Sequence, residues 1–146
     1  MTSAQPGPDA DPNCLFCKII SGVIPSRRIY EDDQAVAFLD IGAWHPGHSL
    51  VIPRRHVPDL ISGEPSLAVI APAIEAVARM LVDRLGAGGV NLLSSSGAVA
   101  GQEVFHLHVH VVPRYASETG LDRMIHRRQL PEGELDSVYR QIQGSQ

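Results

Sequence analysis

The sequence contains no apolar run that approaches the ~18 residues a membrane-spanning helix requires, so we expect no membrane partner. Its first residues, MTSAQPGPDADP, also lack the basic and then apolar regions of a secretory signal peptide. They are small, polar and rich in proline, which predicts a disordered tail over residues 1–13. Internal repeats, heptads and low-complexity core segments are absent as well. A cytoplasmic protein is the default expectation.

Positive charge is scarce in this chain. It has 12 Lys and Arg residues against 16 Asp and Glu residues, a formal net charge of −4. A protein that binds DNA or RNA usually shows a basic surface patch, so we expect no nucleic-acid partner. The same balance does not exclude a small phosphorylated ligand, because backbone N–H groups can bind a phosphate.

At 146 residues, the chain has the length of one domain with a sizeable core. The segment RRIYEDDQAVAFLD predicts two short strands around a turn at residues 32–33, and SLVIP and GVNLLSS predict one strand each. From Ser66 to Leu85, apolar residues recur at three- and four-residue steps, which predicts an amphipathic helix ended by Gly86. Pro72 lies inside this pattern, so the helix either kinks there or begins near it.

Shorter helices are predicted at CLFCKIISG, capped by Asn13 and closed by Gly22, and from about Glu132 to Ile142. Strands joined by hairpins, together with one long helix, indicate an α+β fold. We expect an antiparallel sheet of about five strands with one long helix and short flanking helices. The domain would span residues 14–115, followed by a partly helical C-terminal extension over residues 116–146.

A histidine at every second position marks the segment GQEVFHLHVHVVP, residues 101–113. Alternation of His106, His108 and His110 with apolar, mostly β-branched residues predicts a strand. On a strand the three imidazoles share one face, each roughly 6–7 Å from the next. Aligned imidazoles can serve a metal, a proton relay or a nucleophile. The alternative is a strand whose polar face happens to be rich in histidine.

The two cysteines of the chain, Cys14 and Cys17, form a CxxC pair. This spacing is typical of a redox dithiol or of half a zinc site. A redox motif usually follows a strand, whereas a proline-rich tail precedes this one, so zinc is the favoured interpretation and redox or free thiols remain the alternative. Structural zinc is usually four-coordinate. His56, in PRRH, and His106 are the candidates for the two remaining ligands.

The segment HLHVHVV resembles the signature of the histidine triad (HIT) superfamily of nucleotide hydrolases and transferases. The resemblance extends from about Cys14 to Tyr115. CLFCKIISGVIP is similar to the zinc-bearing, bacterial-type branch that resembles nucleoside phosphoramidases. The resemblance implies the α+β fold described above, a structural zinc and no organic cofactor. It also implies one set of zinc ligands: Cys14, Cys17, His56 and His106.

The resemblance assigns the other two triad histidines to chemistry. His108 would be the nucleophile that attacks an α-phosphorus and forms a nucleotidyl-histidine, which water then hydrolyses; a neutral imidazole is a competent nucleophile near pH 7. His110 would donate a hydrogen bond to the phosphate and hold the attacking geometry. His48, in PGHSLVIP, matches a supporting active-site histidine, although a loop histidine bonded to backbone is an equal alternative.

The glycine-bearing loop before the histidines is suited to a phosphate, because Gly97 and Gly101 let backbone N–H groups approach a ligand. The resemblance makes four loop positions phosphate contacts: Ser95, Gly101, Gln102 and Glu103. Two of them depart from the family pattern. Ser95 stands where the family often has Asn or Gln, and Glu103 where the best-known branches have Ser or Thr. A carboxylate at 103 would repel phosphate if it pointed inward, so either it points away or its backbone N–H makes the contact.

The resemblance also implies a nucleoside pocket. Its base-holding positions are apolar, and plain core packing is the alternative for them: Leu15, Phe16, Ile19 and Phe38. Asp40, followed by Ile41, matches a ribose site, since a carboxylate can accept hydrogen bonds from both ribose hydroxyls. The alternative for Asp40 is a turn residue ahead of Gly42.

The leading hypothesis is therefore a HIT-type hydrolase that cleaves a nucleoside monophosphate, expected to be a purine nucleotide, from an amine, acyl or phosphate group. A dinucleoside polyphosphate hydrolase or phosphorylase is a second interpretation. The nucleotidyltransferase branch comes third, because it carries His-Pro-His instead of the HLHVH found here. A zinc-stapled nucleotide-binding module with little turnover is an alternative of a different class. Most family members of this size are homodimers, so the resemblance also implies a homodimer formed through the long helix and a neighbouring strand. The same helix face would equally cover its own sheet.

Overall fold

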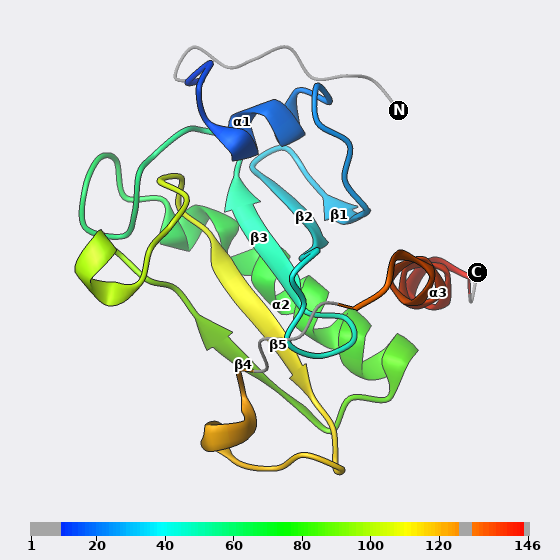
Figure 1. The fold of residues 1–146 in the computed structure, drawn as a ribbon. Coiled ribbons are helices and arrows are strands. Elements are labelled where there is room, and N and C mark those ends of the chain that lie inside the picture. The colour runs from blue at the N-terminus through cyan, green and yellow to red at the C-terminus, as the bar shows by residue number, and fades with distance from the viewer. Residues whose placement is uncertain (1–9, 126–129, 145–146) are drawn as a thin grey trace.

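The computed structural model describes residues 10–125 and 130–144. Its centre is a five-stranded antiparallel sheet in the order β1-β2-β3-β5-β4 (Figure 1). The strands are β1 (Arg28–Glu31), β2 (Ala35–Leu39), β3 (Ser49–Pro53), β4 (Gly89–Leu93) and β5 (Val109–Arg114). The predicted α+β architecture with about five strands and one long helix is confirmed. Most of the predicted tail at 1–13 lies outside the described residues.

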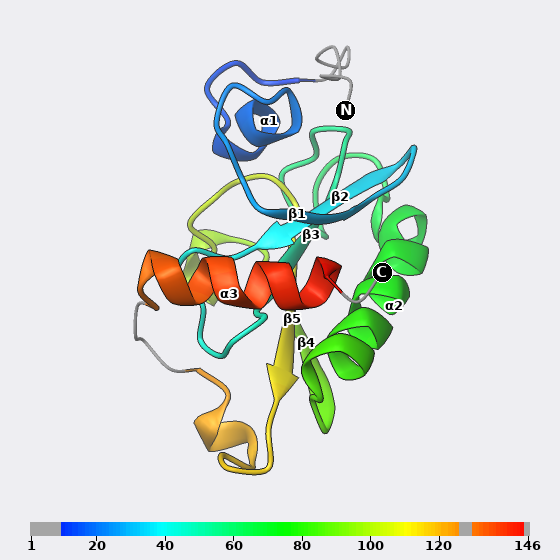
Figure 2. The same ribbon diagram turned by 90° about the vertical axis from the view of Figure 1, so that its right-hand side faces the viewer.

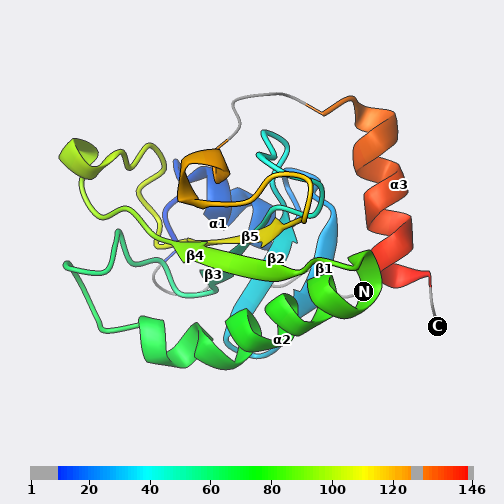
Figure 3. The ribbon, with the colours of Figure 1, turned by 90° about the horizontal axis from the view of Figure 1, so that it is seen from below.

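Helices cover both faces of the sheet, as the views in Figures 2 and 3 show. The short helix α1 (Leu15–Ile20) lies over one face and the long helix α2 (Leu67–Leu85) over the other. The alternation of β2 explains both layers, because successive side chains of a strand point to opposite faces. Ala35, Ala37 and Leu39 pack with α2, while Val36 and Phe38 pack with α1.

Helix α2 has the predicted bounds and the predicted buried stripe. The buried side chains recur at three- and four-residue steps: Ile70, Ala73, Ile74, Val77 and Leu81. The helix ends at Gly86, which adopts φ 75° and donates its N–H to the carbonyl of Val82. Pro72 lies in the second turn, inside the helix. None of the helices in the described part of the chain has the length and hydropathy needed to cross a bilayer.

Helix α3 (Glu132–Gln143), predicted from about Glu132 to Ile142, packs against the same core as α2. Its Val138 and Ile142 are buried there, and the Nε of Arg27 donates to Asp136 Oδ1 at 2.8 Å. In Figure 2 the helix crosses beside β1. Helix α3 is thus held against the sheet by both apolar packing and an ion pair. The division into a domain over residues 14–115 and an extension over residues 116–146 stays a prediction.

The predicted strand over the three histidines is wrong in extent. Strand β5 begins only at Val109, so His106 and His108 lie in the segment that leads into it. Its pairing with β3 ends at Val51 opposite Val109, and its pairing with β4 ends at Leu93 opposite His110. Farther along β3, Pro53 has no N–H to donate, and its carbonyl accepts from His106 Nε2 instead. The alternation itself holds, because Leu107, Val109 and Val111 all face the α2 core.

The predicted cap of the first helix is also wrong. Cys14, rather than Asn13, is the N-cap of α1, with extended backbone angles and with its Sγ accepting the N–H of Cys17 at 3.4 Å. The thiol therefore takes the place that Ser, Thr, Asp or Asn usually occupies. Gly22 follows the helix with φ 85°, in the closing role predicted for it.

Candidate functional site

Two cysteines and two histidines from three separate segments meet beneath α1. Cys14 caps α1 and Cys17 lies within it, His56 follows β3, and His106 precedes β5. Cys14 Sγ lies 3.4 Å from His106 Nδ1, and Cys17 Sγ lies 3.4 Å from His56 Nδ1 and 3.6 Å from His106 Nδ1. The two Nδ1 atoms are 3.2 Å apart. All four predicted metal ligands are thus in one cluster.

These separations fit a tetrahedral metal site. Bonds of about 2.0–2.1 Å to nitrogen and 2.3 Å to sulfur place two nitrogens about 3.3 Å apart, and a sulfur and a nitrogen about 3.6 Å apart. His106 donates its Nε2–H to the carbonyl of Pro53 at 2.8 Å, which leaves the lone pair on Nδ1 facing the thiols. Burial lowers the pKa of His106 to about 4, so the ring is neutral at pH 7.

The thiols need a positive charge beside them to ionise. Burial raises the pKa of Cys17 to about 11, and both cysteines are free rather than joined as a disulfide. A metal ion would supply that charge, whereas a redox dithiol requires an accessible thiolate of low pKa. The donor set therefore favours a metal over the redox alternative. Four protein ligands leave no open position, which is typical of a structural site.

His108 offers a lone pair on its outward nitrogen. Its Nδ1 lies 2.8 Å from the carbonyl oxygen of His106. A carbonyl only accepts hydrogen bonds, so Nδ1 carries the proton and Nε2 is unprotonated in the neutral ring. The ring of Phe16 packs edge-on against it, with centroids 5.1 Å apart. His108 is thereby held in the tautomer that a nucleophile requires.

His110 has the opposite arrangement. The backbone N–H of Trp44 donates to His48 Nδ1 at 3.0 Å, so His48 carries its proton on Nε2. That Nε2–H points to His110 Nδ1 at 2.8 Å and also lies 3.5 Å from Asp40 Oδ2. His110 Nδ1 is therefore an acceptor, and Nε2–H is the donor that this ring has left. His48, predicted as a supporting histidine, fixes the tautomer of His110.

Burial keeps both supporting rings neutral. It lowers the pKa of His48 to about 3 and that of His110 to about 4. Neighbouring imidazoles add to the effect, because His45 opposes a charge on His48 and His48 opposes one on His110. The chain of hydrogen bonds from Trp44 through His48 to His110 is therefore an arrangement of uncharged groups at pH 7.

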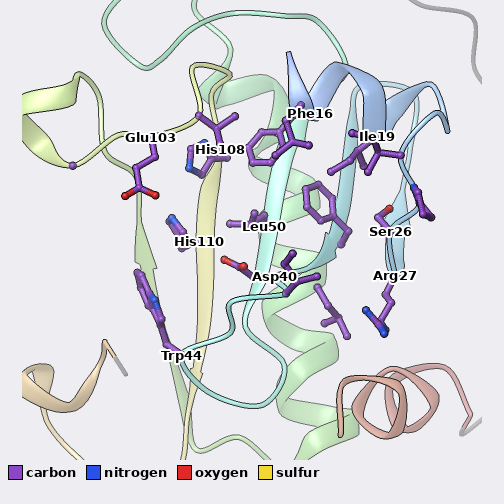
Figure 4. Close-up of a pocket in the computed structure, with 18 residues that line it drawn as sticks. Phe16, Ile19, Ser26, Arg27, Asp40, Trp44, Leu50, Glu103, His108 and His110 are labelled. Carbon is purple, nitrogen blue, oxygen red and sulfur yellow. The ribbon is translucent and has the colours of Figure 1, made fainter. Parts of the chain in front are cut away.

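His108 and His110 line one end of a cavity of about 380 Å³, the size range of small-molecule sites. Figure 4 shows the histidines at one end and Ile19, Ser26 and Arg27 at the other, with Phe16, Leu50 and Asp40 between them. The lining includes most of the predicted nucleotide-binding residues: Leu15, Phe16, Ile19, Phe38, Asp40, Ile41, Gly101 and Glu103.

The apolar side chains of the cavity serve two purposes at once. Phe16 and Phe38 are buried in the core cluster under α1, with ring centroids 5.6 Å apart, and they also face the cavity. Both residues are therefore core residues and part of the cavity lining, and their role in holding a base stays a prediction. Asp40 is also divided: Oδ1 accepts the N–H of Gly42 at 2.8 Å in a turn, while Oδ2 lies toward His48.

Two predicted phosphate contacts lie outside the cavity lining, Ser95 and Gln102. The side chain of Gln102 accepts the N–H of Gly97 at 2.7 Å and donates to the carbonyls of Pro58 and Val104. These hydrogen bonds hold the loop in its shape. They leave the side chain of Gln102 no free N–H for the predicted contact with phosphate. Gly101 does line the cavity, with φ 101°, a conformation that favours glycine.

Sequence analysis missed Trp44. Its indole stacks on His110, with centroids 4.9 Å apart and planes 13° apart, and lies against His48 at 4.5 Å. The signal was present, since this is the one tryptophan of the chain and it falls in the loop between Asp40 and His48. Arg27 was also missed. Its partner Asp136 lies 109 residues away in the sequence, and no local sequence pattern indicates such a pair.

Comparisons with known proteins give a consistent result. The family model described as the HIT domain matches residues 21–117. The protein called hit of Bacillus subtilis is 44% identical over 109 residues, covering 74% of this chain and 75% of that protein. The adenosine 5'-monophosphoramidase of Schizosaccharomyces pombe is 38% identical, covering 75% and 80% of the two chains. The crystal structure of a zinc-bound histidine triad protein from Mycobacterium smegmatis superposes with a TM-score of 0.74 and 36% identity, covering 90% and 94%.

Proposed function

Because this chain belongs to the HIT domain family, we propose that it is a hydrolase that releases a purine nucleoside monophosphate from an amine, acyl or phosphate group through a nucleotidyl-histidine on His108. The observation that carries the proposal is the pair of opposite tautomers at one end of the cavity. His108 presents a lone pair and His110 an N–H donor, with ring centroids 5.2 Å apart. A nucleophile and a donor to the phosphate are the two groups this reaction needs.

The reaction has two displacements at phosphorus. His108 Nε2 attacks with its lone pair, and the bond from phosphorus to the leaving atom breaks with its electron pair; the leaving atom takes a proton from water. The ring is now cationic, which strengthens the hydrogen bond from Nδ1–H to the carbonyl of His106. Water then attacks phosphorus and releases a proton, and the bonding pair returns to Nε2. His110 Nε2–H would donate to a phosphoryl oxygen in both steps.

The nucleoside would occupy the remainder of the cavity. Phe16, Ile19 and Phe38 offer apolar surface to a base, and the Oδ2 of Asp40 would accept from a ribose hydroxyl. The named activity of the yeast relative, an adenosine 5'-monophosphoramidase, supports an amine as the leaving group and a purine as the base.

The metal in this proposal is a structural zinc held by Cys14, Cys17, His56 and His106. The interatomic distances support it, as does the zinc-bound relative from Mycobacterium smegmatis. When bound, zinc would supply the positive charge that two buried thiolates require. It would also fix the backbone of His106, whose carbonyl orients the nucleophile.

Turnover of adenosine 5'-phosphoramidate by the wild type and by His108→Ala tests the proposal. We expect about a 10⁴-fold loss of kcat/KM in the variant, since a covalent nucleophile is removed, with AMP binding retained. Wild-type enzyme quenched in an alkaline denaturant, in which the P–N bond of a nucleotidyl-histidine survives, should carry one nucleotide on His108, detected as a mass increase. Diadenosine tetraphosphate serves as the comparison substrate. Nucleotide binding without turnover of either substrate would instead favour a binding module, and full activity of His108→Ala would refute the covalent route.

A further inference from the structure

The carboxylate of Glu103 lies at the reactive end of the cavity. The residue follows Gly101 and Gln102 in the loop that leads to the histidines, and its side chain is exposed. In Figure 4 its carboxylate extends from the loop toward His110. Among the residues that the structure describes, Arg27 is the one cationic side chain in the cavity lining, and it lies at the opposite end. The charge nearest the reacting phosphorus would therefore be negative.

A second hollow, of about 280 Å³, adjoins the cavity at this point. Leu15, Glu103 and Val104 line both spaces and so form the rim between them. The second hollow also contains Asp11, whose Oδ1 accepts the N–H of Asn13 at 2.8 Å. In the described part of the chain, no Lys or Arg lines this hollow. Two carboxylates thus line a space that opens beside the histidines.

The same hollow touches the metal cluster through Cys14 and His56. Two thiolates and two neutral imidazoles around a divalent ion carry no formal net charge, so the cluster does not offset the two carboxylates. A group entering this space from the cavity meets a negative field on the Glu103 side and on the Asp11 side.

The leaving group would have to pass this rim. A nucleoside between Phe16 and Arg27 would occupy the part of the cavity away from the histidines, and its phosphorus would lie by His108. Phosphoryl transfer places the leaving atom roughly opposite the attacking one. The departing portion of the substrate therefore extends away from His108, out of the cavity and beside Glu103.

We propose that Glu103 makes this site selective for leaving groups that carry a positive charge, such as the free ammonium of a diamine phosphoramidate, and that it disfavours anionic leaving groups such as polyphosphates. This inference rests on the hydrolase proposed above. The physical basis is attraction or repulsion across the rim, which is strongest for charges a few ångströms apart and weakens with added salt. Glu103 stands where the best-known branches have Ser or Thr, and on this proposal that difference determines which leaving groups the site prefers.

The test compares three adenosine 5'-phosphoramidates of similar length, made from propylamine, 1,3-diaminopropane and β-alanine. Their leaving groups are neutral, cationic and anionic. We expect the wild type to prefer the cationic over the neutral substrate by about fivefold in kcat/KM at low salt, the size of one partly exposed ion pair. The anionic substrate should be disfavoured by a similar factor. Glu103→Gln should bring all three values within about twofold of one another, whereas Asp83→Asn on α2 makes the same change in net charge and should keep the wild-type order.

Binding provides a readout that is independent of catalysis. In the His108→Ala background, the three conjugates should bind in the same order, and adding Glu103→Gln should remove the order. Equal dissociation constants in His108→Ala, or an order that survives Glu103→Gln, would overturn the inference about Glu103. Failure of the wild type to hydrolyse even the neutral substrate would count against the hydrolase alone, because the binding order still tests Glu103.

Discussion

Two histidine clusters lie next to each other in this molecule and use the same ring in different ways. In the metal cluster, His56 and His106 direct their Nδ1 atoms at each other and at two sulfurs. In the reactive cluster, His48 and His110 alternate donor and acceptor, and His110 and His108 face a cavity. The hydrogen-bond partners of three rings account for the difference. A carbonyl partner leaves His106 and His108 a lone pair for zinc or phosphorus, whereas the N–H of Trp44 fixes the proton of His48 on Nε2, which donates to His110.

The clusters are connected through His106, and the ring of Phe16 packs against both His106 and His108. His106 contributes its ring to the metal cluster and its carbonyl to His108 Nδ1 at 2.8 Å. We therefore expect the two clusters to fail differently: damage to the metal cluster should reach the nucleophile, while damage to the reactive cluster should leave the metal in place.

Cys14→Ala should have the largest effect on stability. The variant should lose its zinc and at least about 4 kcal/mol of the free energy of unfolding, since loss of a metal is among the most damaging changes known. Turnover should fall as well, because His106 then loses its anchor. Metal analysis of untagged protein and urea unfolding check both results. His108→Ala is the control, with full zinc and little change in stability; retained zinc in Cys14→Ala would defeat the metal assignment.

Acid should destabilise the reactive cluster. The folded pKa of His48, about 3, is below its ordinary value of 6.5, so between these values the unfolded chain binds more protons than the folded one. Stability is full above about pH 6.5 and falls as the pH drops, by about 3 kcal/mol from His48 at pH 4. The carboxylate of Asp40 favours the protonated form of His48, whereas His45 and His110 oppose a positive charge on that ring.

Urea unfolding at pH 7 and at pH 4.5 measures this loss. His48→Gln should lose less stability between the two values than the wild type does, because the amide does not titrate. An equal loss in both proteins would mean that His48 does not contribute in this pH range.

A matched pair of substitutions at His48 should separate the effect of its hydrogen bond to His110 from the effect of its packing. The amide nitrogen of Gln can replace Nε2–H as donor to His110, whereas the amide of Asn corresponds to the Nδ1 side that accepts from Trp44. We expect kcat to fall roughly 10–100-fold in His48→Asn, as for loss of a supporting hydrogen bond, and clearly less in His48→Gln. Steady-state kinetics and melting temperatures distinguish the two; equal kcat values would mean that the donor to His110 does not matter.

Removal of the stacked indole should have the smallest effect. Trp44→Ala should lower kcat about fivefold, corresponding to roughly 1 kcal/mol for an aromatic pair, while Trp44→Phe keeps a ring over His110 and should stay near the wild type. The metal content should be unchanged in both variants. A loss of zinc in Trp44→Ala would contradict the separation of the two clusters.

Patterns local in the sequence predicted most of the fold. The steps of three and four residues defined α2, and alternation correctly assigned Leu107, Val109 and Val111 to the core. The start of β5 was not predictable in this way, because it depends on where two neighbouring strands stop pairing. The use of Cys14 as a helix cap depends on a thiol taking a role that oxygen-bearing side chains usually have.

The spacing of Cys14 and Cys17 indicated half a zinc site, and the resemblance to the HIT superfamily selected His56 and His106 from the seven histidines of the chain. Trp44 over His110, Arg27 with Asp136, and the loop-shaping bonds of Gln102 required knowledge of which distant segments meet. The homodimer and the cytoplasmic location stay predictions from the resemblance and from composition.

The ion pair between Arg27 and Asp136 has a consequence for how the protein is made. Arg27, in the cavity wall, can pair with Asp136 only after α3 has packed. His108 and His110, at the other end, take their positions only after β5 has joined the sheet. During synthesis from the N-terminus, the first half of the chain therefore carries a cavity wall, two thiols and one imidazole of the metal cluster, but no reactive site. Under the proposed function, nucleotide binding would therefore begin only after α3, with Asp136, has emerged and packed beside Arg27.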